Sequence, residues 1–197
     1  MRRIISLDDV NDVRARISRA RTIAAQRFRD AFEAGRVQPE AHLAIQAAAL
    51  LEVAEGVRVR GGGAIDYDIR GRDVTPFVVR GEPLFPHLSV VRTPEGIFEY
   101  FMIISEILAS PAWSVTKLIA SSDEYDEALR RMQQPQIVRV AFASFLPAVD
   151  EAMLEVTLHT RAMEERIERR FLALDEKNEF HFHSRELITE GRGGVTV

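Results

Sequence analysis

The 197-residue sequence contains no cysteine. Disulfide bonds, thiolate metal ligands and thiol nucleophiles are therefore excluded. The sequence also lacks the patterns of a serine-hydrolase nucleophile elbow, a Walker phosphate loop, a Rossmann dinucleotide fingerprint and a zinc-protease helix. No residue is therefore marked as catalytic by one of these four local motifs.

Long apolar runs are also missing. The most apolar stretch, residues 97–108, is interrupted by Glu99 and Glu106, and it is shorter than the roughly 20 residues that a membrane-spanning helix needs. Near the N-terminus, Asp8 and Asp9 follow the first apolar residues at once, so the apolar core of a signal peptide does not develop. We therefore expect a soluble, cytoplasmic protein with no membrane partner.

The composition is that of a folded protein, with 46% hydrophobic and 28% charged residues. A chain of this length is expected to bury one substantial core. We predict a single globular domain over residues 1–190 and a frayed tail over residues 191–197. The net charge is −4, but residues 1–36 hold more arginines than acidic residues, so this end is locally basic.

Two helices are predicted in the N-terminal part. Ser6 and Asp9 form a capping pattern at the start of the first helix, and Gly35 ends it. Pro39 then opens a second helix that reaches about residue 55 and is apolar on nearly all sides, which indicates burial. Together the two predict an αα-hairpin over residues 7–55.

The middle of the chain predicts mixed structure. Alternating runs at 57–60 and 64–70 flank three glycines, which favours a β-hairpin. Further strands are expected over 75–80 and 84–92, and a strand over 136–145. Thr93 and Pro94 are typical of a helix start and predict a helix over 94–109. A shorter helix is expected between residues 121 and 134.

The C-terminal part predicts the longest helix of the chain, from Pro147 to about residue 174. Apolar residues recur there at spacings of three and four, and Glu165 and Arg169 form a favourable i,i+4 pair. A last strand is expected over 178–187. The predicted fold class is α+β, with long amphipathic helices (the N-terminal αα-hairpin and the C-terminal helix) packed on a small, mostly antiparallel sheet. The stripe of the C-terminal helix comprises Val149, Met153, Val156, Thr160, Met163, Ile167 and Leu174.

Glu179, His181 and His183 form the sharpest chemical pattern. In a strand these three side chains share one face, since side chains alternate with a period of two. Two imidazoles and a carboxylate could hold a divalent metal such as Zn²⁺ or Fe(II). The alternative is that Phe180 and Phe182 pack inward and the polar face meets water.

A second pattern follows the three glycines. Asp66 and Asp68 share one strand face, and two such carboxylates could bind Mg²⁺. In the alternative interpretation, these aspartates are the solvent face of an exposed hairpin. No other cofactor is predicted.

The first helix offers two candidate surfaces. Its apolar positions follow a heptad-like seam that could contact another subunit or a partner protein. These positions are Val10, Val13, Ile17, Ala20 and Ala24. Arginines beside the seam could neutralise the phosphates of a nucleic acid, or simply form a solvated surface. These are Arg14, Arg16, Arg19 and Arg21.

Three functions follow as hypotheses. The favoured one is a non-enzymatic assembly or interaction protein that forms a homo-oligomer or docks a protein partner through its long helices. The second is a metal-dependent hydrolase or transferase that uses Glu179, His181 and His183. The third is a nucleic-acid-binding adaptor that uses the arginine-rich helix.

Overall fold

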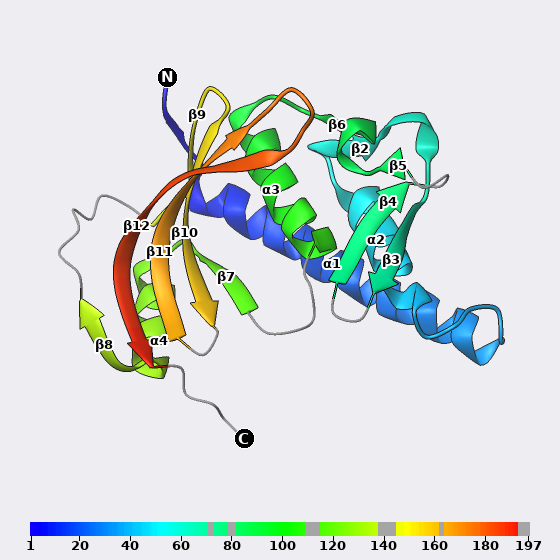
Figure 1. Ribbon diagram of the computed structural model, residues 1–197, viewed down its shortest axis with the longest axis horizontal. Helices are drawn as coiled ribbons and strands as arrows, with labels where there is room; N and C mark the ends of the chain where they lie inside the picture. Colours follow the sequence, from blue (N-terminus) through cyan, green and yellow to red (C-terminus); the bar gives the residue numbers. More distant parts are fainter. Residues whose placement is uncertain (71–72, 79–81, 109–114, 138–144, 162–163, 193–197) are drawn as a thin grey trace. The chain divides into compact units, whose positions relative to one another are not determined.

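The computed structural model describes residues 1–70, 73–78, 82–108, 115–137, 145–161 and 164–192. The chain divides into two compact units. Figure 1 labels most of the helices and strands. Unit 1 comprises Met1–Val10, Pro111–Asp175 and Phe180–Val197. Unit 2 comprises Asn11–Ser110 and Glu176–Glu179. The sequence predicts a single domain, and this remains a prediction because compact units of contacts do not establish independent folding.

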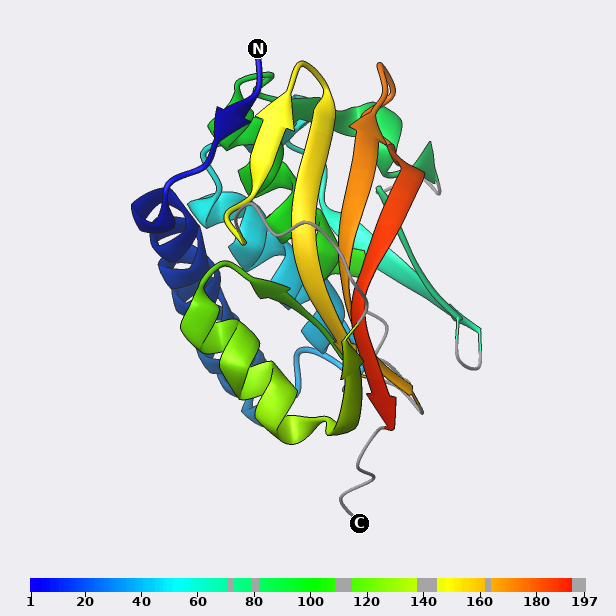
Figure 2. The same ribbon diagram turned by 90° about the vertical axis from the view of Figure 1, so that its left-hand side faces the viewer.

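Unit 1 contains a large antiparallel sheet, which among the described residues has seven strands (Figure 2). Six of them follow the order β1-β9-β10-β11-β12-β8, and the seventh, β7, pairs with β10. The strands are β1 (Arg3–Ile4), β7 (Val115–Ile119), β8 (Gln133–Ile137), β9 (Ala148–Asp150), β10 (Met153–Arg161), β11 (Glu164–Leu174) and β12 (Phe180–Arg192).

Helix α4 (Ser122–Arg131) packs on the unit 1 sheet. The Ser121 side chain caps its start by accepting a hydrogen bond from the Glu124 backbone N–H at 3.3 Å, and acidic first-turn residues suit the positive end of the helix dipole. A buried apolar cluster then joins the helix to three strands. It consists of Ile119, Ala128, Met132, Ile167 and Ile188.

The predicted C-terminal helix is wrong. Most of its described residues form the antiparallel strands β9, β10 and β11, and in the last two Leu154 is paired with Leu172 and His159 with Ile167. One face of β10 is buried and carries Leu154, Val156 and Leu158. These residues follow the period of two that is typical of a strand, although the segment also fits the three-and-four spacing of a helix.

The reason for this error is that polar residues are buried on the opposite face, where charge pairing across the strands compensates them. His159 Nε2 lies 2.9 Å from Glu165 Oε2, with both side chains buried. Arg169 contacts Glu155 at 3.3 Å and Glu186 at 3.2 Å. Of these residues, the sequence assigns Glu155, Glu165 and Arg169 to the helix face opposite the apolar stripe, with Glu165 and Arg169 paired to each other.

Unit 2 combines helices with two small sheets. Helix α1 (Leu7–Glu33) begins in unit 1 and supplies its remaining residues to unit 2, which also holds α2 (Ala41–Val53) and α3 (Pro94–Leu108). Strands β2 (Val57–Val59) and β6 (Leu88–Val90) form one sheet, and β3 (Ile65–Arg70), β4 (Asp73–Val78) and β5 (Glu82–Pro83) form the other. Two short 3₁₀ helices, η1 (Arg60–Gly62) and η2 (Phe85–His87), complete the unit.

The boundaries of α1 and α3 confirm the capping predictions. Ser6 Oγ accepts a hydrogen bond from the Asp9 backbone N–H at 3.1 Å and donates one to Asp9 Oδ2 at 2.6 Å. Gly35 has a φ of +64° and follows the last turn of α1. At α3, the Gly96 backbone N–H donates to Thr93 Oγ1 at 3.1 Å.

Two further expectations in this region are wrong. Residues 7–55 do not form an αα-hairpin, because α2 packs mainly on α3 and β3, although Arg27 of α1 pairs with Glu52 of α2 at 2.7 Å. The runs at 57–60 and 64–70 do not pair with each other, since β2 pairs with β6 and β3 with β4. Gly61 and Gly62 have positive φ values of 73° and 70° between the two sheets, so the glycines redirect the chain instead of closing a hairpin.

Five predicted segments extend beyond the described residues. The residues that lie outside are 79–80 and 138–144 of two expected strands, 109 of the helix expected over 94–109, 162–163 of the expected C-terminal helix, and 193–197 of the tail. Met163 of the predicted stripe is therefore outside the description. Gly191 and Arg192, at the start of the predicted tail, belong to β12.

The fold is α+β, but its sheet is large where the sequence predicts a small one. Among the described helices, none is long and apolar enough to cross a membrane.

Candidate functional site

A pocket of about 690 Å³ lies in unit 2, beside the β3–β4–β5 sheet and the C-terminal end of α3. Most of its wall is apolar, with aromatic, proline and leucine side chains. The described residues that line it are Tyr67, Asp68, Thr75, Pro76, Phe77, Pro83, Leu84, Phe85 and Leu108.

Strand pairing brings most of this wall together. The register of β3 with β4 and of β4 with β5 places six of the lining residues opposite one another in pairs. The pairs are Tyr67 with Pro76, Asp68 with Thr75, and Phe77 with Pro83. The pocket therefore depends on the pairing of strands, and Leu108 is added to it from a helix about forty residues further along the chain.

Tyr67 supplies a neutral polar group to the pocket. Its hydroxyl donates a hydrogen bond to the backbone carbonyl of Ile107 at 3.2 Å. Burial raises the pKa of Tyr67 to about 12, because the phenolate is more costly to bury than the phenol. The phenol therefore stays protonated at neutral pH.

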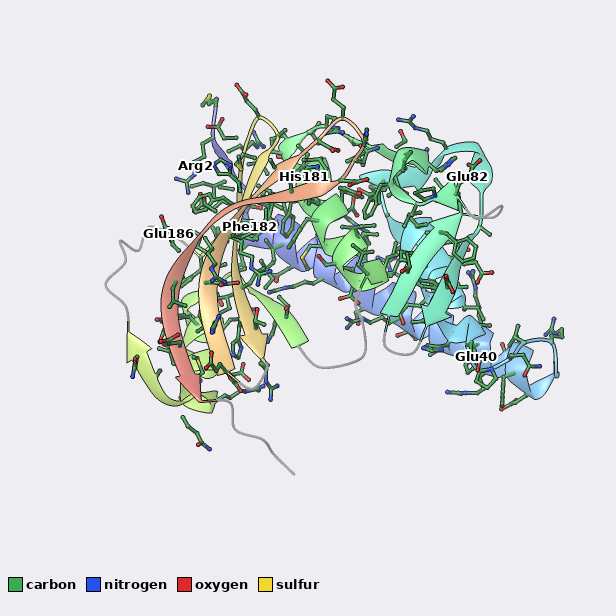
Figure 3. The ribbon with its side chains drawn as sticks, viewed as in Figure 1. Arg2, Glu40, Glu82, His181, Phe182 and Glu186 are labelled. Atoms are coloured by element: carbon green, nitrogen blue, oxygen red, sulfur yellow. The ribbon has the colours of Figure 1, made fainter. Side chains whose placement is uncertain are left out.

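Asp68 adds a negative charge, and it is the only charged residue among the described residues of the lining. It is partly buried. The neighbouring acid Glu82, labelled in Figure 3, is exposed, and its Oε2 lies 2.7 Å from His87 Nε2. The pocket thus combines a mostly apolar lining with a few polar residues, as small-molecule sites of about 300–1,000 Å³ commonly do.

The residues of the predicted histidine metal site are not among the described residues that line this pocket. His181, labelled in Figure 3, is exposed on β12, where its Nε2 lies 2.7 Å from Asp175 Oδ2. Glu179 belongs to unit 2. In the part of the chain that the structure describes, no group of three or more histidine or acidic residues could hold a metal ion. Metal binding by Glu179, His181 and His183 stays a prediction from the sequence alone.

The alternative for that strand, inward-packed phenylalanines, is wrong for Phe182, which is 60% exposed. His183 lies where the register of β11 with β12 shifts, so the strict alternation on which the prediction depends is interrupted there.

The two aspartates of the second pattern lie in different surroundings. Asp68 lines the pocket, whereas Asp66 is exposed and its Oδ1 accepts a hydrogen bond from the Tyr67 backbone N–H at 2.8 Å. Magnesium binding by this pair is likewise a prediction that the structure neither adds to nor tests.

The seam of α1 is buried within the chain itself. In this conformation its side chains are not available to another subunit, although the assembly function as such is not tested. The buried seam residues are Val10, Val13, Ile17, Ala20 and Ala24.

Arg16 and Arg21, candidates for nucleic-acid contacts, form ion pairs within unit 2. Arg16 contacts Glu99 at 2.8 Å, and Arg21 Nε donates to Glu106 at 3.1 Å. Arg19 is exposed and Arg14 is partly buried. The phosphate contacts expected from this helix would compete with the two carboxylates.

Sequence reasoning missed the pocket except for Asp68. The missed signal is the concentration of proline and aromatic residues between residues 75 and 86, including Phe77 and Phe85. Prolines do not donate to a strand ladder and are expected in edge strands, but Pro76 lies in β4, the middle strand of the β3-β4-β5 sheet. Phe77, which follows Pro76 in β4, and Phe85 both line the pocket.

Comparisons with models of known protein families, with curated proteins and with solved structures find no match for this chain.

Proposed function

We propose that this chain is a binding protein that holds a small, largely apolar organic molecule in the unit 2 pocket. The observation that carries the proposal is the pocket of about 690 Å³, whose described lining is mostly aromatic, proline and leucine residues with Tyr67, Asp68 and Thr75 as the polar ones. Burial of apolar ligand surface provides the binding free energy at roughly 25 cal/mol per Å². The polar groups then fix the orientation of the ligand.

This proposal keeps only the non-enzymatic character of the hypothesis that the sequence favours, because its ligand is a small molecule and not a protein partner or a second subunit. The α1 seam is buried, so it supports the fold. None of the described residues that line the pocket belongs to α1.

Fluorescence of N-phenyl-1-naphthylamine, a neutral probe that brightens in apolar surroundings, tests the proposal. We expect saturable binding when protein is titrated into a fixed probe concentration, with a Kd on the order of 10–100 µM for a ligand of this size. Leu108→Trp, which fills the pocket rim, should weaken binding at least tenfold.

Phe32→Trp is the matched control, because Phe32 is 49% exposed and Leu108 is 41% exposed, and Phe32 does not line the pocket. It should leave the Kd within twofold. Absence of saturable binding, or equal weakening by both substitutions, would contradict the proposal.

A further inference from the structure

The carbonyl of Ile107 lies at the C-terminal end of α3, where backbone carbonyls lack partners within the helix. The helix ends at Leu108, so the amide N–H four residues beyond Ile107, the usual helical partner of its carbonyl, is not part of the helix. Ile107 is buried, and a buried carbonyl without a hydrogen-bond partner is costly in free energy. The end of α3 is therefore stabilised by any donor that reaches this carbonyl.

Tyr67 is such a donor. Its hydroxyl donates a hydrogen bond to the Ile107 carbonyl at 3.2 Å, although the two residues are 40 apart in the chain. Burial raises the pKa of Tyr67 to about 12, so the hydroxyl keeps the proton of this bond at neutral pH. The bond fastens the last turn of α3 to strand β3.

The fastened turn carries part of the pocket wall. Leu108 follows Ile107 directly and is the one residue of α3 among the described lining residues. Leu108 is 41% exposed, so its own packing restrains it little and its position depends on the turn that carries it. Tyr67 and its cross-strand partner Pro76 belong to the same lining. One hydrogen bond therefore connects the strand and the helix end that form the wall.

We propose that Tyr67 is a positioning residue for ligand binding, because its bond to the Ile107 carbonyl holds the last turn of α3 and keeps Leu108 in the pocket wall. This inference depends on the proposed function, since it identifies what keeps the same pocket in its binding shape. Tyr67 acts through the end of the helix, and its hydroxyl need not contact the ligand.

Tyr67→Phe tests the inference, because it removes the hydroxyl and retains the aromatic ring. We expect the Kd for N-phenyl-1-naphthylamine to rise about fivefold, the factor that corresponds to the net contribution of one typical hydrogen bond. Leu108→Ala, which removes most of the positioned side chain, should raise the Kd roughly threefold or more, because apolar contact with the probe is lost.

The double variant separates positioning from a general loss of structure. If Tyr67 acts through Leu108, adding Tyr67→Phe to Leu108→Ala should change the Kd by less than about twofold, since the side chain that the bond positions is already absent. A structural role that does not involve Leu108 would instead give about the same fivefold rise in both backgrounds.

Tyr100→Phe is the matched control. Tyr100 also belongs to α3, its buried hydroxyl donates to the backbone carbonyl of Asn178, and it is not among the described lining residues. This substitution should leave the Kd within about twofold, because it removes a comparable bond. Hydrogen exchange followed by NMR provides a second measurement. Tyr67→Phe should speed the exchange of the amides of residues 105–108, whereas Tyr100→Phe should leave their exchange unchanged.

The outcomes separate the two proposals. If N-phenyl-1-naphthylamine does not bind the unsubstituted protein saturably, the proposed function fails and this inference fails with it. If the probe binds and Tyr67→Phe leaves the Kd unchanged, the pocket function stands and the positioning role is wrong. Equal weakening by both tyrosine substitutions, an unchanged Kd in Leu108→Ala, or a full fivefold effect of Tyr67→Phe in the Leu108→Ala background would also overturn the inference.

Discussion

Replacing Glu99 with alanine should destabilise unit 2 far more than replacing Glu106, although both belong to α3 and both pair with an arginine of α1. Glu99 is 3% exposed. Its Oε1 accepts a hydrogen bond from Arg16 Nε at 2.9 Å, and its Oε2 accepts one from the Glu55 backbone N–H at 3.1 Å and one from that of Gly56. One carboxylate therefore connects α1, α3 and the chain that follows α2.

The expected loss in the free energy of unfolding follows from the burial of the Glu99 carboxylate. Removing one member of a buried ion pair costs about 3–5 kcal/mol, because the other charge and the polar groups stay buried without partners. The Arg16 side chain is 19% exposed and can partly reach water, so we expect a value near the lower limit, about 3 kcal/mol. For a chain of this size, that is a fall in Tm of roughly 6–12 °C.

Glu106→Ala provides the matched control. Its pair with Arg21 is more exposed, at 22% for Glu106 and 57% for Arg21, and such pairs contribute about 0–1 kcal/mol. Urea unfolding followed by circular dichroism, together with differential scanning calorimetry, measures both variants. Equal losses in the two, or a loss below about 1 kcal/mol for Glu99→Ala, would refute the reasoning from burial.

Three further predictions concern unit 2. Gly56→Ala should lower the free energy of unfolding by about 1–3 kcal/mol in urea titrations, because a Cβ would lie 2.8 Å from Glu99 Oε2; a neutral substitution would contradict the close approach. Asn178→Ala should cost about 2 kcal/mol and more than Asn178→Gly, since the residue has a φ of 67° and its Nδ2 donates to the Leu88 carbonyl at 2.9 Å. Calorimetry that ranks glycine below alanine would oppose this account. Because burial raises the pKa of Tyr67 to about 12, unfolding releases its proton between pH 10 and 12, so stability should fall as pH rises through that window and less so in Tyr67→Phe. An identical fall in Tm from pH 9 to 11 in both proteins would count against it.

The parts of the fold that the sequence predicts well are those with local signals. The cap at Ser6, the end of α1 at Gly35 and the start of α3 at Thr93 each depend on a few adjacent residues. Such signals act within one turn of helix and need no knowledge of distant partners.

The C-terminal strands could not be predicted in the same way. Glu165 and Arg169 are polar residues that local patterns assign to solvent, yet His159 and Glu155 from the neighbouring strand pair with them. Burial of charge becomes acceptable only through these cross-strand partners. The pattern of residues within one segment gives no information about these partners, which lie on another strand.

The pocket falls between these two cases. Asp68 is recognisable from the sequence as a chemical group, but as a metal ligand. The other residues of its pocket cannot be identified from the sequence alone. Strand pairing places Thr75 opposite Asp68, and the end of α3 adds Leu108 to the same lining. Asp68 is interpreted as part of an apolar pocket, and not as a metal ligand, because of neighbours that are distant in sequence.

The central claim, that the unit 2 pocket binds a small apolar molecule, is tested most directly by ¹H–¹⁵N NMR of the labelled protein during titration with N-phenyl-1-naphthylamine. The account predicts saturable shifts of the amide signals of Tyr67, Asp68, Phe77, Leu84 and Leu108, with the signals of β10 and β11 unchanged. Saturable shifts confined to residues outside the pocket lining, or no shifts at probe concentrations that saturate the fluorescence, would contradict it.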